Sequence, residues 1–71
     1  MKFLTNKDME ILKIIKENPS TTKANIARNS KYIQANLVHT FKKLEQEDYI
    51  TISKVKQTII QLTKKGERVA I

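Results

Sequence analysis

Apolar residues repeat with a helical period through the first two thirds of the chain and with a strand period after that. The first helical stripe comprises Ile11, Leu12, Ile14 and Ile15. Thr5 can cap the first amides of this helix, and Asp8, three residues later, can accept a hydrogen bond from the Thr5 amide, which makes a capping box. Pro19 disfavours a helical residue before it, so the predicted helix ends near Asn18.

Two further helices follow, separated by a few polar residues. Thr22 is the best cap for the second, which should run to about Asn29 with Ile26 turned inward. The third is predicted from near Ile33 to Glu47. At 100° per residue its core stripe is Ile33, Leu37, Phe41 and Leu44. The opposite face carries Ala35, His39, Lys42 and Gln46, with Asn36, Val38 and Lys43 on the flanks.

The hydrophobic period then changes to two, which predicts two strands at residues 49–53 and 58–62. Residues 54–57 are too few for anything except the tip of a hairpin, and they carry enough charge to stay in solvent. One face of the hairpin should cover the helices with Ile50, Ile52, Ile60 and Leu62. A last short helix is expected to open at Thr63, to be interrupted early by Gly66, and to carry Val69 and Ile71.

With 71 residues, the chain has room for one domain, residues 1–71, and a small core. There is no cysteine, and the one histidine, His39, has no carboxylates at a recognisable metal-binding spacing, so no metal or cofactor is expected. No segment approaches the roughly 18 apolar residues of a membrane helix, and no signal peptide is recognisable, so the protein is expected to be cytoplasmic.

The net charge of +7 is distributed in blocks. Residues 20–43 hold five basic side chains and no acidic one: Lys23, Arg28, Lys31, Lys42 and Lys43. A short acidic run, Glu45, Glu47 and Asp48, separates this block from a second basic one that includes Lys54 and Lys56. Separated blocks, as opposed to mixed signs, indicate that particular elements face a polyanion such as nucleic acid.

The order helix, helix, helix, hairpin, helix, with a basic third helix and a basic hairpin tip, resembles the winged helix-turn-helix family. The segments that carry the likeness are residues 4–15, 22–27, 41–45, 49–50 and 62–66. The most specific is Leu62-Thr63-Lys64-Lys65-Gly66, a phrase that commonly closes such wings. Their order and spacing are similar to those of MarR-type regulators and of small archaeal and viral winged-helix proteins. The resemblance implies an α+β fold with a three-helix core, a two-stranded wing and a short C-terminal helix.

Three departures from the family pattern change what the resemblance implies. Asp48 stands where a glycine usually ends the third helix, and Asp tolerates the left-handed conformation better than most residues. Asn25 stands where a glutamate often sits, which weakens a second capping box. The long additional helices of MarR-type dimers have no counterpart, so a homodimer would need another surface. The candidates for that surface are Phe3, Leu4, Met9, Val69 and Ile71.

The resemblance implies that the third helix enters the major groove of duplex DNA, while the wing lies on the backbone or reaches a minor groove. Gln34, Asn36 and His39, with Ala35 beside them, are the candidates for reading bases. The candidates for phosphate contacts are Lys23, Arg28, Lys31, Lys42, Lys43, Lys54 and Lys56. Tyr32 is expected to fill the turn before the helix rather than to stack on a base.

The function expected is that of a sequence-specific transcriptional regulator that represses by occlusion, with no small-molecule effector evident. A weakly specific nucleoid-type protein is the nearest alternative, because the lysines outnumber the candidates for base reading. A winged-helix protein-interaction module is a second alternative, since fold does not settle function. An enzyme is disfavoured, because the chain has no glycine-rich phosphate loop and no pair of carboxylates in an apolar setting.

Overall fold

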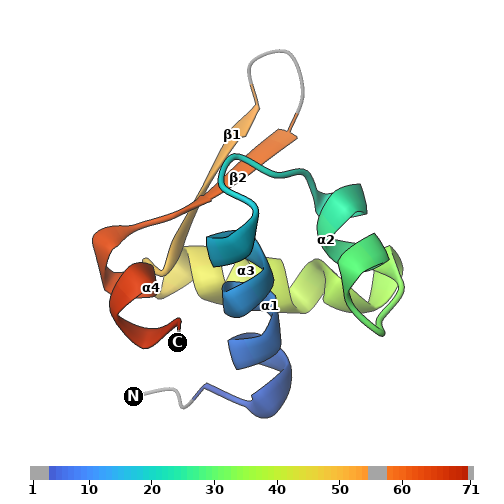
Figure 1. Cartoon of the computed structure of the whole chain (residues 1–71), viewed down its shortest axis with the longest axis horizontal. Helices are drawn as coiled ribbons and strands as arrows, with labels where there is room; N and C mark the ends of the chain where they lie inside the picture. Colours follow the sequence, from blue (N-terminus) through green and yellow to red (C-terminus); the bar gives the residue numbers. More distant parts are fainter. Residues whose placement is uncertain (1–3, 55–57, 71) are drawn as a thin grey trace.

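The computed structural model describes residues 4–54 and 58–70. Three helical segments, a two-stranded antiparallel hairpin and a last short helix follow one another along the chain (Figure 1). The elements are α1 (Asn6–Glu17), α2 (Lys23–Asn29), a 3₁₀ turn η1 (Gln34–Leu37), α3 (Val38–Gln46), β1 (Ile50–Lys54), β2 (Thr58–Leu62) and α4 (Lys64–Val69). The α+β winged helix-turn-helix fold predicted from the sequence is confirmed.

Both ends of α1 follow the predicted chemistry. The Thr5 N–H donates to Asp8 Oδ2 at 2.9 Å, and the Asp8 N–H donates to Thr5 Oγ1 at 3.2 Å, so the capping box is complete. At the other end the Asn18 N–H donates to the carbonyls of Ile14 and Ile15. The helix stops there, one residue before Pro19, as expected.

The second capping box is only half formed. Thr22 caps α2 by accepting from the Asn25 N–H at 3.2 Å, as predicted. The Asn25 side chain donates instead to Thr21 Oγ1 at 2.8 Å, so it does not return a bond to the Thr22 backbone. The predicted weakening at this position is confirmed.

The predicted start of the third helix is wrong. The segment opens as the 3₁₀ turn η1 and becomes α-helical only at Val38. A 3₁₀ turn advances about 120° per residue, so positions before Leu37 are rotated away from where a continuous α-helix would put them. Ile33, which the helical stripe assigned to the core, is therefore 64% exposed, whereas Leu37, Phe41 and Leu44 are buried as expected.

The hairpin presents the predicted face to the helices. Ile50 pairs with Leu62 and Ile52 pairs with Ile60, so these four side chains lie on one side of the sheet. Ile50 and Ile60 are fully buried there. Thr21 exchanges two backbone hydrogen bonds with Ile60, which joins the turn before α2 to the hairpin. The strand pattern does not predict this third partner.

Gly66 does not interrupt the last helix. It lies inside α4 and is buried against Tyr49, the residue just before β1. An added Cβ would lie 2.1 Å from the Tyr49 carbonyl oxygen. A glycine allows the helix to approach the backbone this closely. Asp48 does adopt the left-handed conformation expected after α3, with φ 66°. Ile71 lies outside the described residues.

Candidate nucleic-acid interface

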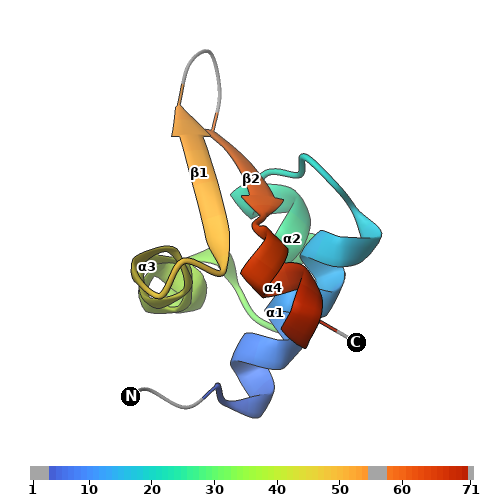
Figure 2. The ribbon, with the colours of Figure 1, turned by 90° about the vertical axis from the view of Figure 1, so that its left-hand side faces the viewer.

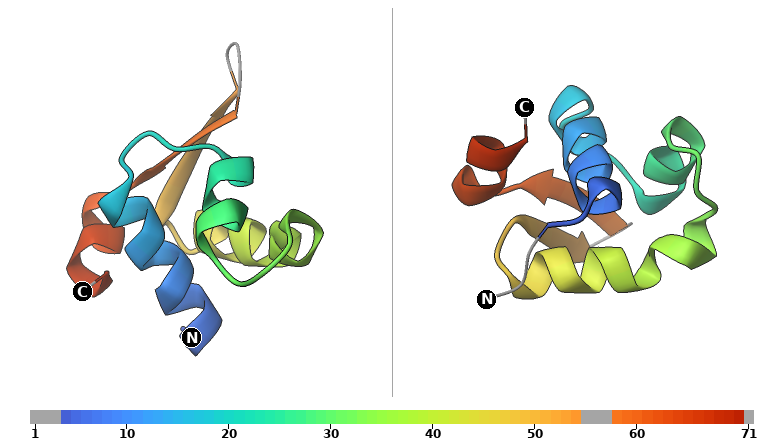
Figure 3. Two further views of the ribbon diagram at one scale, coloured as in Figure 1. Left: turned by 45° about the vertical axis from the view of Figure 1, so that its right-hand side comes forward. Right: turned by 90° about the horizontal axis from the view of Figure 1, so that it is seen from below.

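One side of α3 is exposed to solvent. Viewed along its axis, α3 forms an edge of the molecule, and the hairpin of β1 and β2, which we call the wing, rises above the same side (Figure 2). From below, α3 crosses the molecule lengthwise with α1 on its inner side (Figure 3). The exposed residues of η1 and α3 are Gln34, Ala35, Asn36, Val38, His39, Lys42, Glu45 and Gln46. All candidates for base reading are therefore at the surface.

The basic candidates differ in how far they are exposed. Arg28, Lys31, Lys42 and Lys54 are exposed. Lys23 is half-buried, with its Nζ 5.9 Å from the centre of the Phe41 ring. Lys56, which the sequence predicts at the tip of the wing, lies outside the described residues.

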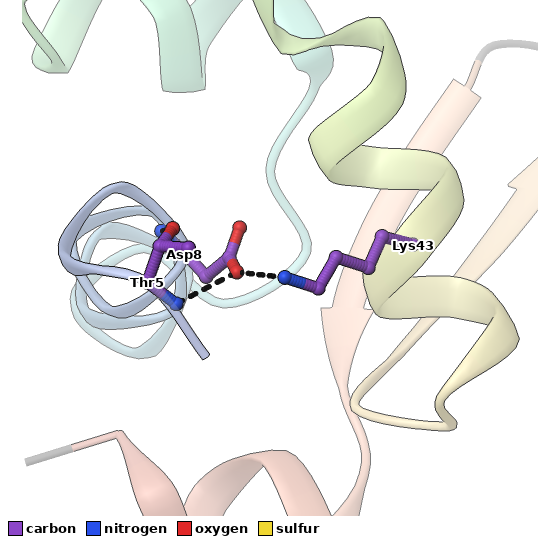
Figure 4. A network of polar contacts seen from close by, with 3 residues as sticks. All are labelled: Thr5, Asp8 and Lys43. Atoms are coloured by element: carbon purple, nitrogen blue, oxygen red, sulfur yellow. Dashed lines mark hydrogen bonds and ion pairs between the residues drawn. The ribbon is translucent and has the colours of Figure 1, made fainter. Parts of the chain in front are cut away.

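Lys43 is placed differently from the other lysines. Its ammonium donates to Asp8 Oδ2 at 2.6 Å, reaching from α3 across to the first turn of α1 (Figure 4). Its side chain is 25% exposed, and that of Asp8 is 4% exposed. Lys43 thus contacts α1, which favours a role in holding α3 on α1 over the phosphate contact expected for it.

The charge of Asp8 is held by these neighbours. Burial alone would raise the pKa of Asp8, but the Lys43 ammonium and the Thr5 N–H and hydroxyl together lower the pKa below its ordinary value of 3.8. One carboxylate therefore completes the cap of α1 and fixes α3 against it. The local pattern predicts the cap but not the ion pair, because nothing local links positions 35 residues apart.

A second contact of α1 supports the start of α3. Lys7 Nζ donates to the Asn36 carbonyl oxygen at 2.8 Å and lies 4.9 Å from the centre of the Tyr32 ring. Tyr32 is half-buried and packs on the core, consistent with the structural role expected for it. Lys31 Nζ lies 5.8 Å from the same ring. Lys7 was not among the predicted site residues, and its role depends on a turn whose geometry the sequence did not show.

The chemistry available on α3 is that of directional hydrogen bonding beside positive charge. Amide and imidazole groups at Gln34, Asn36 and His39 can donate and accept, and Lys42 supplies charge one turn further along. Within residues 4–54 and 58–70, no three His, Asp or Glu side chains gather to hold a metal ion. No helix in that part of the chain is long and apolar enough to span a membrane.

A hollow of about 310 Å³ lies elsewhere, between the end of α1, β2 and α4. Its lining includes Lys16, Ser20, Gln61 and Glu67, and none of the candidate interface residues.

These elements define the chain as a winged helix-turn-helix protein. Within that class it is a MarR-like winged helix, as comparison with solved structures shows. It superposes on a transcriptional repressor, CouR, bound to a 23-mer DNA duplex, with a TM-score of 0.87 and 22% identity over 96% of this chain and 51% of that one. It superposes on the transcriptional regulator SlyA with a TM-score of 0.86 and 27% identity, over 94% of this chain and 50% of that one.

The chain also superposes on Lactococcus lactis ZitR, a zinc-responsive MarR family member, in complex with DNA. The TM-score is 0.85 at 29% identity, over 97% of this chain and 49% of ZitR. The chain therefore spans about half the length of these proteins. No protein-family model and no curated protein matches the sequence.

Proposed function

We propose that this protein is a transcriptional regulator that binds duplex DNA with α3 in the major groove and the wing on the backbone or minor groove. The observation that carries the proposal is the exposed polar and basic face of η1 and α3, which the core leaves uncovered on the same side as the wing. CouR, ZitR and Streptococcus pneumoniae FabT, whose winged helices have the same shape, have been solved with DNA. Repression by occlusion of a promoter is the simplest mechanism.

The proposed roles follow from exposure and chemistry. Gln34, Asn36 and His39 read base edges, with Ala35 close enough for van der Waals contact, because amides pair well with adenine and imidazole can donate or accept. The proposed phosphate contacts are Lys23, Arg28, Lys31, Lys42, Lys54 and Lys56. We leave Lys43 out of this set and assign it instead to holding α3 on α1, as its ion pair supports.

The phosphate contacts give the proposal a measurable signature. If six phosphates are neutralised, log K should fall against log salt with a slope near −5, at about −0.9 per contact. The experiment is selection of bound fragments from random duplex DNA, followed by titration of the preferred duplex and of a random one at several salt concentrations. Absence of salt-dependent duplex binding would contradict the proposal.

Two double variants separate the residues proposed to read bases from those proposed to contact phosphates. Asn36→Ala with His39→Ala should change which duplex is preferred, whereas Lys54→Ala with Lys56→Ala should weaken binding to all duplexes alike. If the unaltered protein binds every fragment equally, it is a nucleoid-type protein of low specificity, the alternative that its many lysines favour. A protein-interaction module would bind no duplex.

The proposal extends to assembly and place. Two copies on palindromic half-sites about one helical turn apart would make a homodimer, which sedimentation of the protein with the selected duplex would detect. Of the surface suggested for a dimer, Leu4, Met9 and Val69 are half-buried and pack on the core, and Phe3 and Ile71 lie outside the described residues. The proposed partner places the protein on the nucleoid in the cytoplasm, as one domain without enzymatic activity.

A further inference from the structure

Two large apolar side chains of the described residues stand in solvent, and both belong to the proposed DNA-reading segment. Ile33, just before η1, is 64% exposed, and Val38, the first residue of α3, is 54% exposed. Elsewhere in residues 4–54 and 58–70 the large apolar side chains are buried or half-buried. Both side chains therefore belong to the surface that would meet DNA.

Val38 lies within the polar part of this surface. On an α-helix, residues three and four apart are neighbours, so Val38 and His39 both adjoin Lys42. His39 and Lys42 are exposed as well. Any partner that His39 and Lys42 meet through hydrogen bonds and charge will therefore also meet the two methyl groups of Val38.

The major groove of duplex DNA offers one apolar group to such a side chain. Guanine, cytosine and adenine are told apart there by their hydrogen-bonding atoms and carry no methyl group, whereas thymine adds a 5-methyl group. Valine over a polar edge would remove that edge from water without replacing its hydrogen bonds, which costs free energy. Over a thymine methyl, the same side chain buries apolar surface on both partners.

We infer that Val38 is a specificity-determining residue that selects thymine by contact with its 5-methyl group. The inference rests on the proposed function, since it needs α3 in the major groove. The charge of this segment favours DNA over an apolar protein partner. Arg28 in α2, Lys31 after it and Lys42 in α3 are all exposed. Val38 thus adds an A·T preference to the one expected from Gln34 and Asn36.

The test removes the methyl group and nothing else. The duplex selected by the unaltered protein is resynthesised with deoxyuridine in place of one thymidine at a time, and the dissociation constant of each is measured. One replacement per half-site should weaken binding about fourfold, the effect of burying one methyl-sized group. Val38→Ser should bind the thymidine and deoxyuridine duplexes equally, and its own selection should lose thymine at that position.

The control is Ala24→Ser, a comparable change at an exposed position of α2, which should keep the full preference for thymidine. Circular dichroism of Val38→Ser checks the fold, and serine is well accepted at the start of a helix. The inference is overturned if no deoxyuridine replacement weakens binding, if Val38→Ser keeps the preference, or if selection yields no preferred sequence. If the unaltered protein binds no duplex at all, the proposed function itself is overturned.

Discussion

Asp8 shows how much one side chain can do in a core this small. Among the described residues, the buried polar and charged ones are Asp8, Thr21 and Thr40, so Asp8 carries the buried charge. Its carboxylate accepts from the Thr5 N–H and from the Lys43 ammonium through the same oxygen. Charge-assisted hydrogen bonds of this kind are about twice as strong as neutral ones. The cap of α1 and the position of α3 therefore depend on the same ionised group.

We expect Asp8→Asn to lower the free energy of unfolding by about 1–2 kcal/mol at pH 7, because the charged hydrogen bond between Asp8 and Lys43 is lost while asparagine can still accept from Thr5. The pKa of Asp8 is lower in the folded protein than in the unfolded chain. The contribution of the ionised Asp8 side chain to the free energy of unfolding is therefore complete above the unfolded-state pKa, and it is lost as the pH falls through the folded-state pKa. The variant should match the unaltered protein most closely in strong acid.

Chemical denaturation across the acid range measures this difference, with Glu17→Gln, an exposed position near the end of α1, as the control that should change little. A difference between Asp8→Asn and the unaltered protein that stays constant with pH would contradict the role of the Asp8 charge.

At the scale of elements, the structure differs from the helical pattern of the sequence at the junction of η1 and α3. A stripe of apolar residues at helical spacing treats the segment as one helix, and it correctly identifies Leu37, Phe41 and Leu44 as core. It fails at Ile33 because η1 turns more tightly than an α-helix. The contact that accompanies this tight turn comes from α1, through the bond from Lys7 to the Asn36 carbonyl.

We expect Lys7→Met to loosen η1 while leaving the fold intact. Loss of the ammonium removes the donor to the Asn36 carbonyl, so the amides of residues 34–38 should exchange with solvent several-fold faster. Hydrogen exchange measured by NMR tests this. Lys13→Met, at an exposed position of the same helix, should leave those amides unchanged. Equal exchange in both variants would show that η1 is held by the core alone.

At the scale of the whole molecule, the basic side chains behind the net charge of +7 differ in the contacts that they make within the fold. Lys43 bonds to Asp8, Lys16 Nζ donates to the Ala70 carbonyl and Lys65 Nζ to the Glu47 carbonyl. Arg28, Lys31, Lys42 and Lys54 are exposed on or near the proposed interface. The net charge by itself therefore does not say which basic side chains meet a polyanion.

Replacing a single lysine should distinguish the loss of a phosphate contact from a change in total charge. Lys42→Gln should reduce the magnitude of the slope of log K against log salt by about 1, since one phosphate contact is lost from every duplex. Lys13→Gln carries the same change in net charge away from α3 and should leave the slope unaltered. Fluorescence anisotropy with a labelled duplex measures both, and equal slopes would mean that binding responds to total charge alone.

The sequence by itself determined the elements, their order and most of the core. Helix caps at Thr5 and Thr22, the strand period after Tyr49 and the left-handed Asp48 depend on neighbours a few residues away, so local chemistry reveals them. The same is true of the exposed polar residues of α3, whose spacing sets their face.

Only the tertiary structure decided which groups meet across the fold. The Asp8–Lys43 pair, the Lys7–Asn36 bond and the Thr21–Ile60 pairing join positions that are distant in the sequence. The close approach of α4 to Tyr49, which makes Gly66 a packing position, and the exposure of Ile33 belong with them. Each depends on where one element lies relative to another, and periodicity within a segment carries no information about that.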